Sequence, residues 1–395
     1  MHFIEVEKAQ ALIVEHIVRG PAHQVNLLEA LNSYTAETII APLDMPNFDN
    51  AAMDGYCFAF SDYVEGMDLQ VRYTIQAGDT SQIRLQKGEA ARIFTGAAIP
   101  VGADTVEMQE KVSEQEQKIS IQNAAIQAGQ HIRLQASQTK KGDILIQKNS
   151  FINAGVIGFL AAFGIDKIQV YKKPKIGILV TGNELISTNE MPQKGQIYES
   201  NSTSLLALLH EIKLFDNKVV LVKDDLVEIS KQMDRLLQEV DILLISGGIS
   251  VGDYDFVKEA MKKNEVQEVF YKIKQKPGKP IFFGIKENKR IFALPGNPAS
   301  TYTCFHQYVK PLLLAYVGKD NIFRDSMMAI ITHDYSKKAG LTHFLKAYTD
   351  SGNVQLENGQ ESYKMQAFST ANCLVELTAD LSEIKAGTAV KIILI

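Results

Sequence analysis

Cysteine is scarce in this 395-residue sequence, which contains only Cys57, Cys304 and Cys373. An odd number of scattered cysteines excludes both a disulfide framework and a zinc site built from cysteine. We therefore predict three buried, reduced thiols, which are typical of a reducing compartment.

Positive charge and long apolar runs are also lacking. The chain has 41 Lys and Arg against 46 Asp and Glu, a net charge of −5, which argues against a general nucleic-acid binder. The longest apolar run, residues 155–165, is too short to cross a bilayer, and glutamates interrupt the N-terminal apolar positions, unlike a secretory signal. We expect a cytoplasmic protein that binds neither nucleic acid nor membrane.

The apolar pattern changes several times along the chain, which predicts two to four domains. Helical patterns cover residues 4–17 and 27–38. Short alternating runs up to about residue 146 then predict a β-rich module. Residues 176–317 alternate apolar strands with helices, which predicts a mostly parallel sheet covered by helices on both faces. Short strands return from residue 321 and predict a small β domain.

Small and charged residues follow the predicted strands of the α/β block. In open α/β sheets the ligand lies beyond the carboxyl ends of the strands, so we expect these loops to face one pocket. The loops carry Thr181, Gly182, Asn183 and Glu184; Asp224; Ser246, Gly247, Gly248, Ser250, Gly252, Asp253 and Asp255; and Pro295, Gly296, Asn297 and Pro298.

This composition favours a phosphate-bearing ligand. Glycines let backbone N–H groups approach an anion, and the helix predicted to start near Asp255 adds its positive dipole end. Residues 276–280 add Lys276 and Lys279 on a turn stiffened by proline. Carboxylates beside an anion are explained if Mg²⁺ bridges them to phosphate oxygens. Such an ion could polarise a phosphoanhydride.

Each motif alone also has an ordinary structural explanation. A glycine pair after a strand is most often a tight turn, and Asp224 or Asp255 could cap a helix. A Pro-Gly-Lys-Pro loop is commonly a rigid connection. Convergence of four strand ends in one block favours the pocket. Two polar, turn-rich stretches of the β-rich module, residues 46–56 and 92–100, are by themselves loops of undetermined function.

Eight ordered segments resemble the MoeA family, the molybdopterin molybdenumtransferases to which the gephyrin E domain belongs. They are FDNAAMDGY (48–56), RIFTGAAIPVGADTVEMQE (92–110), GQHIR (129–133), KIGILVTGNEL (175–185), IYESNS (197–202), SGGISVGDYDF (246–256), KPGKP (276–280) and LPGNPAS (294–300).

The resemblance implies an elongated multidomain subunit of α/β plus β-rich class that forms a homodimer with a shared active site. We predict an N-terminal helix packed on the α/β domain, and a linker or helical domain in two segments. An inserted β-rich domain, a doubly wound parallel α/β domain that binds molybdopterin, and a C-terminal β-barrel-like domain complete the subunit. In that order their residues are 1–26, 27–45 with 146–173, 46–145, 174–318 and 319–395.

The resemblance also implies the reaction. In the family, adenylylated molybdopterin and molybdate react with a divalent metal, here expected to be Mg²⁺, to give the loaded cofactor and AMP. Matching motifs give catalytic roles to Asp54, Glu184, Asp224 and Asp255, with Asp224 and Asp255 at the metal. They give ligand-binding roles to Thr95, Gly96, Arg133, Thr181, Gly182, Ser246, Gly247, Gly248, Ser250, Gly252, Lys276, Gly278, Lys279, Pro280, Pro295, Gly296, Asn297 and Pro298. Within that set Ser250, Lys276, Lys279 and Pro280 would line the molybdate site, and Asp54 and the Thr95–Gly96 loop would reach the partner's pocket.

Three departures from the family pattern concern the molybdate side. Gln138 replaces an acidic residue, and Lys346 stands in a strand that usually bears arginine, where it would keep the charge but not the fork. Gln366 or Ala367 takes the place of a serine. Two other functions stay open: molybdopterin adenylyltransferase, and a molybdopterin-binding scaffold that would retain peptide binding after Asp255→Ala. The resemblance also implies other enzymes of cofactor synthesis as partners.

Overall fold

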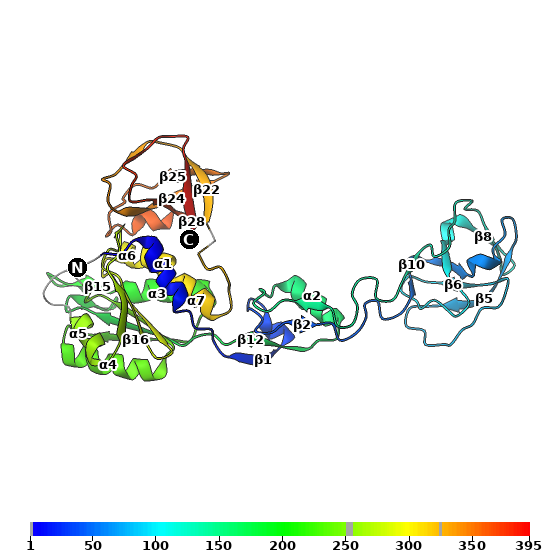
Figure 1. Cartoon of the computed structure of the whole chain (residues 1–395), viewed down its shortest axis with the longest axis horizontal. Coiled ribbons are helices and arrows are strands. Elements are labelled where there is room, and N and C mark those ends of the chain that lie inside the picture. The colour runs from blue at the N-terminus through cyan, green and yellow to red at the C-terminus, as the bar shows by residue number, and fades with distance from the viewer. Residues whose placement is uncertain (1–2, 250–255, 324–325) are drawn as a thin grey trace.

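The computed structural model describes residues 3–249, 256–323 and 326–395. The molecule is elongated, as Figure 1 shows, with a β-rich domain at one end and an α/β domain beside a small β domain at the other. A narrow segment that contains α2 (Ala154–Ala162) joins the two ends. This confirms the expected multidomain α/β plus β-rich fold class.

The α/β domain contains a six-stranded sheet, in which the first four strands are parallel and the fifth runs antiparallel to both of its neighbours. Its spatial order is β16 (Asn217–Val222), β13 (Ile176–Thr181), β17 (Ile242–Ser246), β21 (Lys289–Leu294), β20 (Phe282–Lys286) and β18 (Gln267–Tyr271). All residues of β13 and β17 are buried, which explains why they read as continuous apolar runs.

Helices cover both faces of this sheet. Ile178 of β13 packs with α1 (Val6–Glu15) and α3 (Asn201–Glu211) on one face, and its neighbour Leu179 packs with α4 (Leu226–Glu239) and α5 (Phe256–Lys263) on the other. Successive residues alternate between the two cores because side chains of a strand alternate between faces.

One predicted helix contains a change of helical type. The helix expected over residues 300–317 consists of α6 (Pro298–Cys304), a π-helical segment η4 (Phe305–Val309) and α7 (Lys310–Tyr316). Pro311 has no amide N–H to donate and its ring crowds the preceding turn, which accounts for the widened segment before it.

The helix predicted over residues 27–38 is wrong. Only the short 3-10 helix η1 (Leu27–Ala30) forms there, and the chain turns at Asn32, whose φ is 63°. Thr35 then donates its amide to Ser150 O and Ala36 donates to Gln169 O, at 3.0 and 2.8 Å. Pairing with a distant segment therefore overrides the local helical pattern.

The narrow segment consists of paired strands and α2. It is built from β1 (Ala22–Asn26) with β12 (Lys167–Tyr171), and β2 (Ile39–Ile40) with β11 (Ile144–Ile146). Beyond it, β3 (Asn50–Ala51) pairs with β10 (Ile132–Arg133). The β-rich domain then has a six-stranded sheet in the order β7 (Thr105–Met108), β4 (Gly55–Phe58), β6 (Glu89–Ile93), β5 (Leu69–Ile75), β9 (Lys118–Ile121) and β8 (Val112–Gln115).

The C-terminal strands close into a barrel. Its order is β22 (Ser326–Ile331), β25 (Asn353–Leu356), β24 (Thr342–Asp350), β26 (Cys373–Leu377) and β28 (Ala389–Leu394), and β28 pairs back with β22. The short strand β19 (Gln275–Lys276) of the α/β domain pairs with β24 and so links the two domains. Among the described residues no helix combines the length and apolar character needed to span a membrane.

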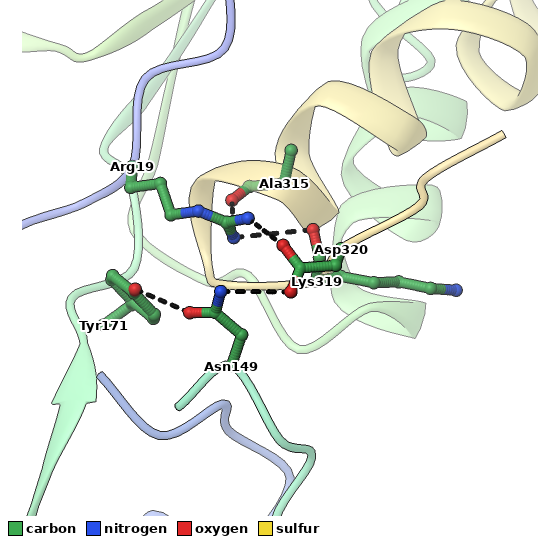
Figure 2. Close-up of polar contacts among 6 residues, drawn as sticks. All are labelled: Arg19, Asn149, Tyr171, Ala315, Lys319 and Asp320. Atoms are coloured by element: carbon green, nitrogen blue, oxygen red, sulfur yellow. Dashed lines mark hydrogen bonds and ion pairs between the residues drawn. The ribbon is translucent and has the colours of Figure 1, made fainter. Parts of the chain in front are cut away.

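A polar junction fixes the narrow segment to the α/β domain (Figure 2). Arg19 donates to Ala315 O at 3.0 Å and forms an ion pair with Asp320. Asn149 donates to the other Asp320 oxygen at 3.0 Å and accepts from the Tyr171 hydroxyl at 2.7 Å. Four separate parts of the chain, at residues 19, 149, 171 and 315–320, thus meet where the narrow segment begins.

Candidate functional site

A pocket of about 680 Å³ lies at the carboxyl edge of the parallel strands. It is lined by residues that follow β13, β17 and β21, which come together as predicted for an open α/β sheet. The predicted site residues that line it are Thr181, Glu184, Ser246, Gly247, Lys279, Pro280, Pro295, Gly296, Asn297 and Pro298.

The fourth predicted loop lies beside this pocket rather than in it. Lys223 and Gly182 line a neighbouring cavity of about 140 Å³. Asn183 donates its amide to the Asp224 carboxylate at 3.3 Å, and Asp224 donates its amide to Asn183 Oδ1 at 3.1 Å. The expectation that all four loops face one pocket is thus correct for three, and Asp224 is tied to the rim through Asn183.

The two glycines after β17 are required by close packing. Gly247 and Gly248 have φ values of 89° and 63°, which L-residues with side chains rarely adopt. A Cβ on Gly247 would collide with Thr181 O, and one on Gly248 would collide with Val257. The Ser-Gly-Gly sequence therefore lets the backbone after β17 lie against the end of β13.

Asn201 is a site residue for which the sequence predicted no role, although it lies in the IYESNS segment. Its side-chain nitrogen donates to Ser246 Oγ at 2.8 Å and to Gly296 O at 2.9 Å, so it joins the loops after β17 and β21. Within the described chain, Asn201 Oδ1 and Thr181 Oγ1 have no hydrogen-bond partner although both atoms are buried. A bound polar ligand would satisfy them. Asn201 opens α3 and follows no strand of the six-stranded sheet, so its position relative to the strand ends gave no sign of this role.

The turn of residues 276–280 contributes one of its two lysines to the pocket. Lys279 and Pro280 line the pocket, whereas Lys276 is exposed on β19 and is not among its lining residues. Gly278 is buried against Cys304, and Gln275 donates to the carbonyl oxygens of Pro277 and Gly278 at 3.0 and 3.3 Å. This packing holds Lys279 at the pocket edge.

Four predicted site residues lie at the opposite end of the molecule, in the β-rich domain of Figure 1: Asp54, Thr95, Gly96 and Arg133. Asp54 accepts hydrogen bonds from the backbone N–H and the hydroxyl of Thr95, both at 2.7 Å. These bonds lower the pKa of the exposed Asp54 carboxyl. Asp54 and Thr95 therefore form one preorganised, ionised group far from the pocket of their own chain.

Lys346 does not present its charge to the pocket. Its side chain is 1% exposed, and its ammonium donates to the carbonyl oxygens of Gly359, Glu361 and Lys364 at 2.7, 3.1 and 2.8 Å. Burial is the main cause that lowers the pKa of this amine. The sequence predicts that Lys346 keeps the charge of the usual arginine, and the structure adds that this ammonium is enclosed, because all three of its donors are used by the protein.

Part of the predicted site lies outside the described residues, namely Ser250, Gly252, Asp253 and Asp255. Within residues 3–249, 256–323 and 326–395 there is no group of three or more His, Cys, Asp or Glu side chains arranged to hold a metal ion. Asp224 is the described member of the predicted metal pair. The three cysteines are buried and free, as predicted.

Comparison with known proteins covers nearly the whole chain. Residues 4–164 match the MoeA N-terminal region (domain I and II), residues 177–315 match a probable molybdopterin binding domain, and residues 328–395 match the MoeA C-terminal region (domain IV). A molybdopterin molybdenumtransferase of Haemophilus influenzae is 34% identical over 375 residues, which cover 93% of this chain and 92% of that protein.

Further relatives agree with these matches. A molybdopterin molybdenumtransferase of Staphylococcus aureus is 32% identical over 400 residues, which cover 99% of this chain and 95% of that protein. The crystal structure of a molybdopterin biosynthesis MoeA protein of Pyrococcus horikoshii superposes with a TM-score of 0.85 at 28% identity, and the match covers 100% of both chains.

Proposed function

Because this chain belongs to the MoeA family, we propose that it is a molybdopterin molybdenumtransferase, which inserts molybdate into adenylylated molybdopterin and releases AMP. The observation that carries this proposal is the pocket of about 680 Å³ at the strand ends, with its lysine and its unpartnered polar atoms. Its size is in the range of cofactor and substrate sites.

The described residues offer separate contacts for the parts of such a ligand. Asn201 Oδ1 can accept a hydrogen bond from the amide-like edge of a pterin. The Thr181 hydroxyl can either donate a hydrogen bond to this edge or accept one from it. Lys279 supplies positive charge, and the glycines after β17 leave room for an anion near the backbone. We assign the pterin and phosphate contacts to these groups.

The carboxylates at the rim fit a divalent cation. Mg²⁺ is usually held by one or two carboxylates together with substrate phosphates and water. Asp224 keeps one carboxylate oxygen free of the Asn183 hydrogen bond, so it suits this role, and we assign Asp255 as its partner. When bound, Mg²⁺ would neutralise charge on the phosphate oxygens. Asn183 would hold the Asp224 carboxylate in place.

We further propose a homodimer with a shared active site. Asp54 and Thr95 lie at the far end of the chain from the pocket and cannot reach it in the same subunit (Figure 1). Their mutual hydrogen bonds form a polar group that is ready to contact a ligand. A second copy of the chain, arranged by a twofold axis, would bring this group to the pocket.

The test is AMP release from adenylylated molybdopterin, measured with and without molybdate and Mg²⁺. We expect release that depends on both. Asp224→Asn should lower the rate by roughly a hundredfold or more, because the metal's charge stabilisation is worth several kcal/mol.

Asp225→Asn is the matched control. The Asp225 side chain accepts a hydrogen bond from the Glu228 amide at 2.8 Å and caps α4, a role that asparagine also performs. This variant should retain the wild-type rate. Equal rates for Asp224→Asn and wild type would remove the metal assignment. Binding of the pterin without AMP release would favour a molybdopterin-binding scaffold instead.

A further inference from the structure

An irregular loop of the C-terminal barrel, residues 357–365, carries an aromatic side chain to the pocket of the α/β domain. Tyr363 lines the pocket although its side chain is 65% exposed. Among the described lining residues, Tyr198 is the other aromatic one.

The loop is anchored to the barrel by Lys346 of β24. Three loop carbonyl groups, those of Gly359, Glu361 and Lys364, accept hydrogen bonds from its ammonium. Gln360 adds two more bonds, since it accepts from the Lys346 amide at 3.0 Å and donates to the Lys346 carbonyl at 2.8 Å. The ammonium has three N–H donors, so this cage satisfies it completely. The loop therefore wraps around one buried lysine.

The loop also contacts the α/β domain directly. The Asn297 side chain, which follows β21 and lines the pocket, donates to Ser362 Oγ at 3.2 Å. Nearby, the rings of Tyr302 in α6 and Phe368 in the barrel are 4.2 Å apart. The strand β24 that carries Lys346 also pairs with β19, which leads into the turn of Lys279. The position of Tyr363 is therefore fixed from both domains.

We propose that Tyr363 is an aromatic wall of the pocket, which stacks on a flat heteroaromatic ring of the ligand, and that Lys346 is the residue that positions it. A solvent-exposed tyrosine ring at the edge of a polar pocket offers an apolar face that such a ring covers on binding. This inference rests on the proposed function, whose substrate contains two rings of this kind, a pterin and an adenine. Buried Lys346 holds the loop in place through its three hydrogen bonds to the loop carbonyl groups.

The experiment measures the dissociation constants of two probes, AMP and a soluble pterin, by calorimetry on the full chain. Tyr363→Ala should raise the dissociation constant of the stacked probe roughly tenfold or more, since stacking of a base on an aromatic side chain commonly strengthens binding by that factor. Tyr363→Phe keeps the ring and should bind within about twofold of wild type. The probe that is affected identifies the ring that Tyr363 contacts. Tyr348→Ala is the control. Tyr348 is an exposed tyrosine of β24, the strand that carries Lys346, and it does not line the pocket, so this variant should bind both probes as wild type does.

The role of Lys346 is tested by a double-mutant cycle. Methionine has a side chain of similar length to lysine but no hydrogen-bond donor. Lys346→Met should therefore release the loop and weaken binding of the same probe that Tyr363→Ala affects. If Lys346 acts through Tyr363, adding Lys346→Met to Tyr363→Ala should cause no further loss, whereas independent effects would multiply. Circular dichroism at the titration temperature checks that each variant is folded, because removing a buried lysine also lowers stability.

The outcomes separate this inference from the proposed function. Binding of either probe to wild type, with loss in Tyr363→Ala, supports both. Binding that is unchanged in Tyr363→Ala overturns the stacking role and leaves the proposed function intact. Multiplied losses in the double variant overturn the positioning role of Lys346. If neither probe binds wild type, the proposed function fails and this inference fails with it.

Discussion

His306 is a buried titratable residue without a described hydrogen-bond partner for either ring nitrogen. It lies in the π-helical segment η4 and contacts the Tyr302 ring at a centroid distance of 4.8 Å. Burial, with a smaller contribution from Lys310, lowers its pKa to about 3. The imidazole is therefore neutral at physiological pH and behaves as a flat, mostly apolar ring.

This burial predicts a pH dependence of stability. In the unfolded chain His306 would titrate near pH 6.5, so below that pH the unfolded state takes up a proton that the folded state does not. The free energy of unfolding should fall as the pH drops from about 6.5 towards 3, by about 2 kcal/mol at pH 5 from this residue. His306→Phe keeps a flat ring without the titration, so its stability should fall less over the same range. Chemical denaturation between pH 7 and 5 measures the difference.

Other groups contribute to the same titration, so the comparison with wild type is what matters. His343, whose pKa burial lowers to about 4, acts in the same direction in both proteins. Parallel stability curves for wild type and His306→Phe would contradict the assignment.

For individual residues, the sequence predicted where a side chain lies better than it predicted what that side chain does. Thr181, Gly247 and Asn297 could be placed in one pocket because each lies at or shortly after the end of a parallel strand, and strand ends share an edge. The enclosure of Lys346 could not be predicted, because a charged side chain in a sequence gives no sign that three carbonyl groups surround it. Asn201 was missed because its contacts join two loops that are far apart along the chain.

Among the elements, the turn between β19 and β20 strictly requires glycine at position 278, close to the pocket. Gly278 has a φ of 82°, and a Cβ there would collide with the Cys304 sulfur. Gly278→Ala should therefore lower the free energy of unfolding by about 2–4 kcal/mol, since both backbone strain and overpacking act against it. It should also weaken the binding of phosphate-bearing ligands, because it would shift the next residue, Lys279, which lines the pocket.

A second glycine separates these two causes. Gly195 has a φ of 92°, but a Cβ there meets open space. Gly195→Ala should cost only the backbone strain, about 1–2 kcal/mol. Urea denaturation of both variants gives the comparison. Equal losses would show that the collision with Cys304 is relieved by a small shift and does not constrain the turn.

Elements with their own buried core were predictable, and those that depend on distant pairing were not. The strands β13 and β17 are apolar throughout because helices cover both faces, so their sequence signal is strong. The segment 27–38 has a helical pattern, but its amides bond to residues near Ser150 and Gln169, which no local pattern reveals. The π-helical segment before Pro311 was likewise read as ordinary helix.

For the whole molecule, the long narrow segment separates the β-rich domain from the pocket, an arrangement that agrees with the shared active site proposed above. Separating the β-rich domain from the pocket leaves the polar Asp54–Thr95 group with no ligand in its own chain (Figure 1). The junction of Arg19, Asn149 and Asp320 fixes the direction in which this segment leaves the α/β domain. A fixed direction is useful if the far end must meet a defined site on a partner.

A shared site predicts complementation between two inactive variants. Asp54→Ala disables the far end of a subunit, and Asp224→Asn disables its pocket, so each homodimer should be nearly inactive. After subunit exchange, half of the dimers are mixed, and each mixed dimer has one pocket in which both groups are intact. Random mixing of equal amounts should therefore restore about a quarter of the wild-type rate of AMP release. If each chain used its own Asp54, mixing would restore nothing, because every pocket would still lack one of the two groups.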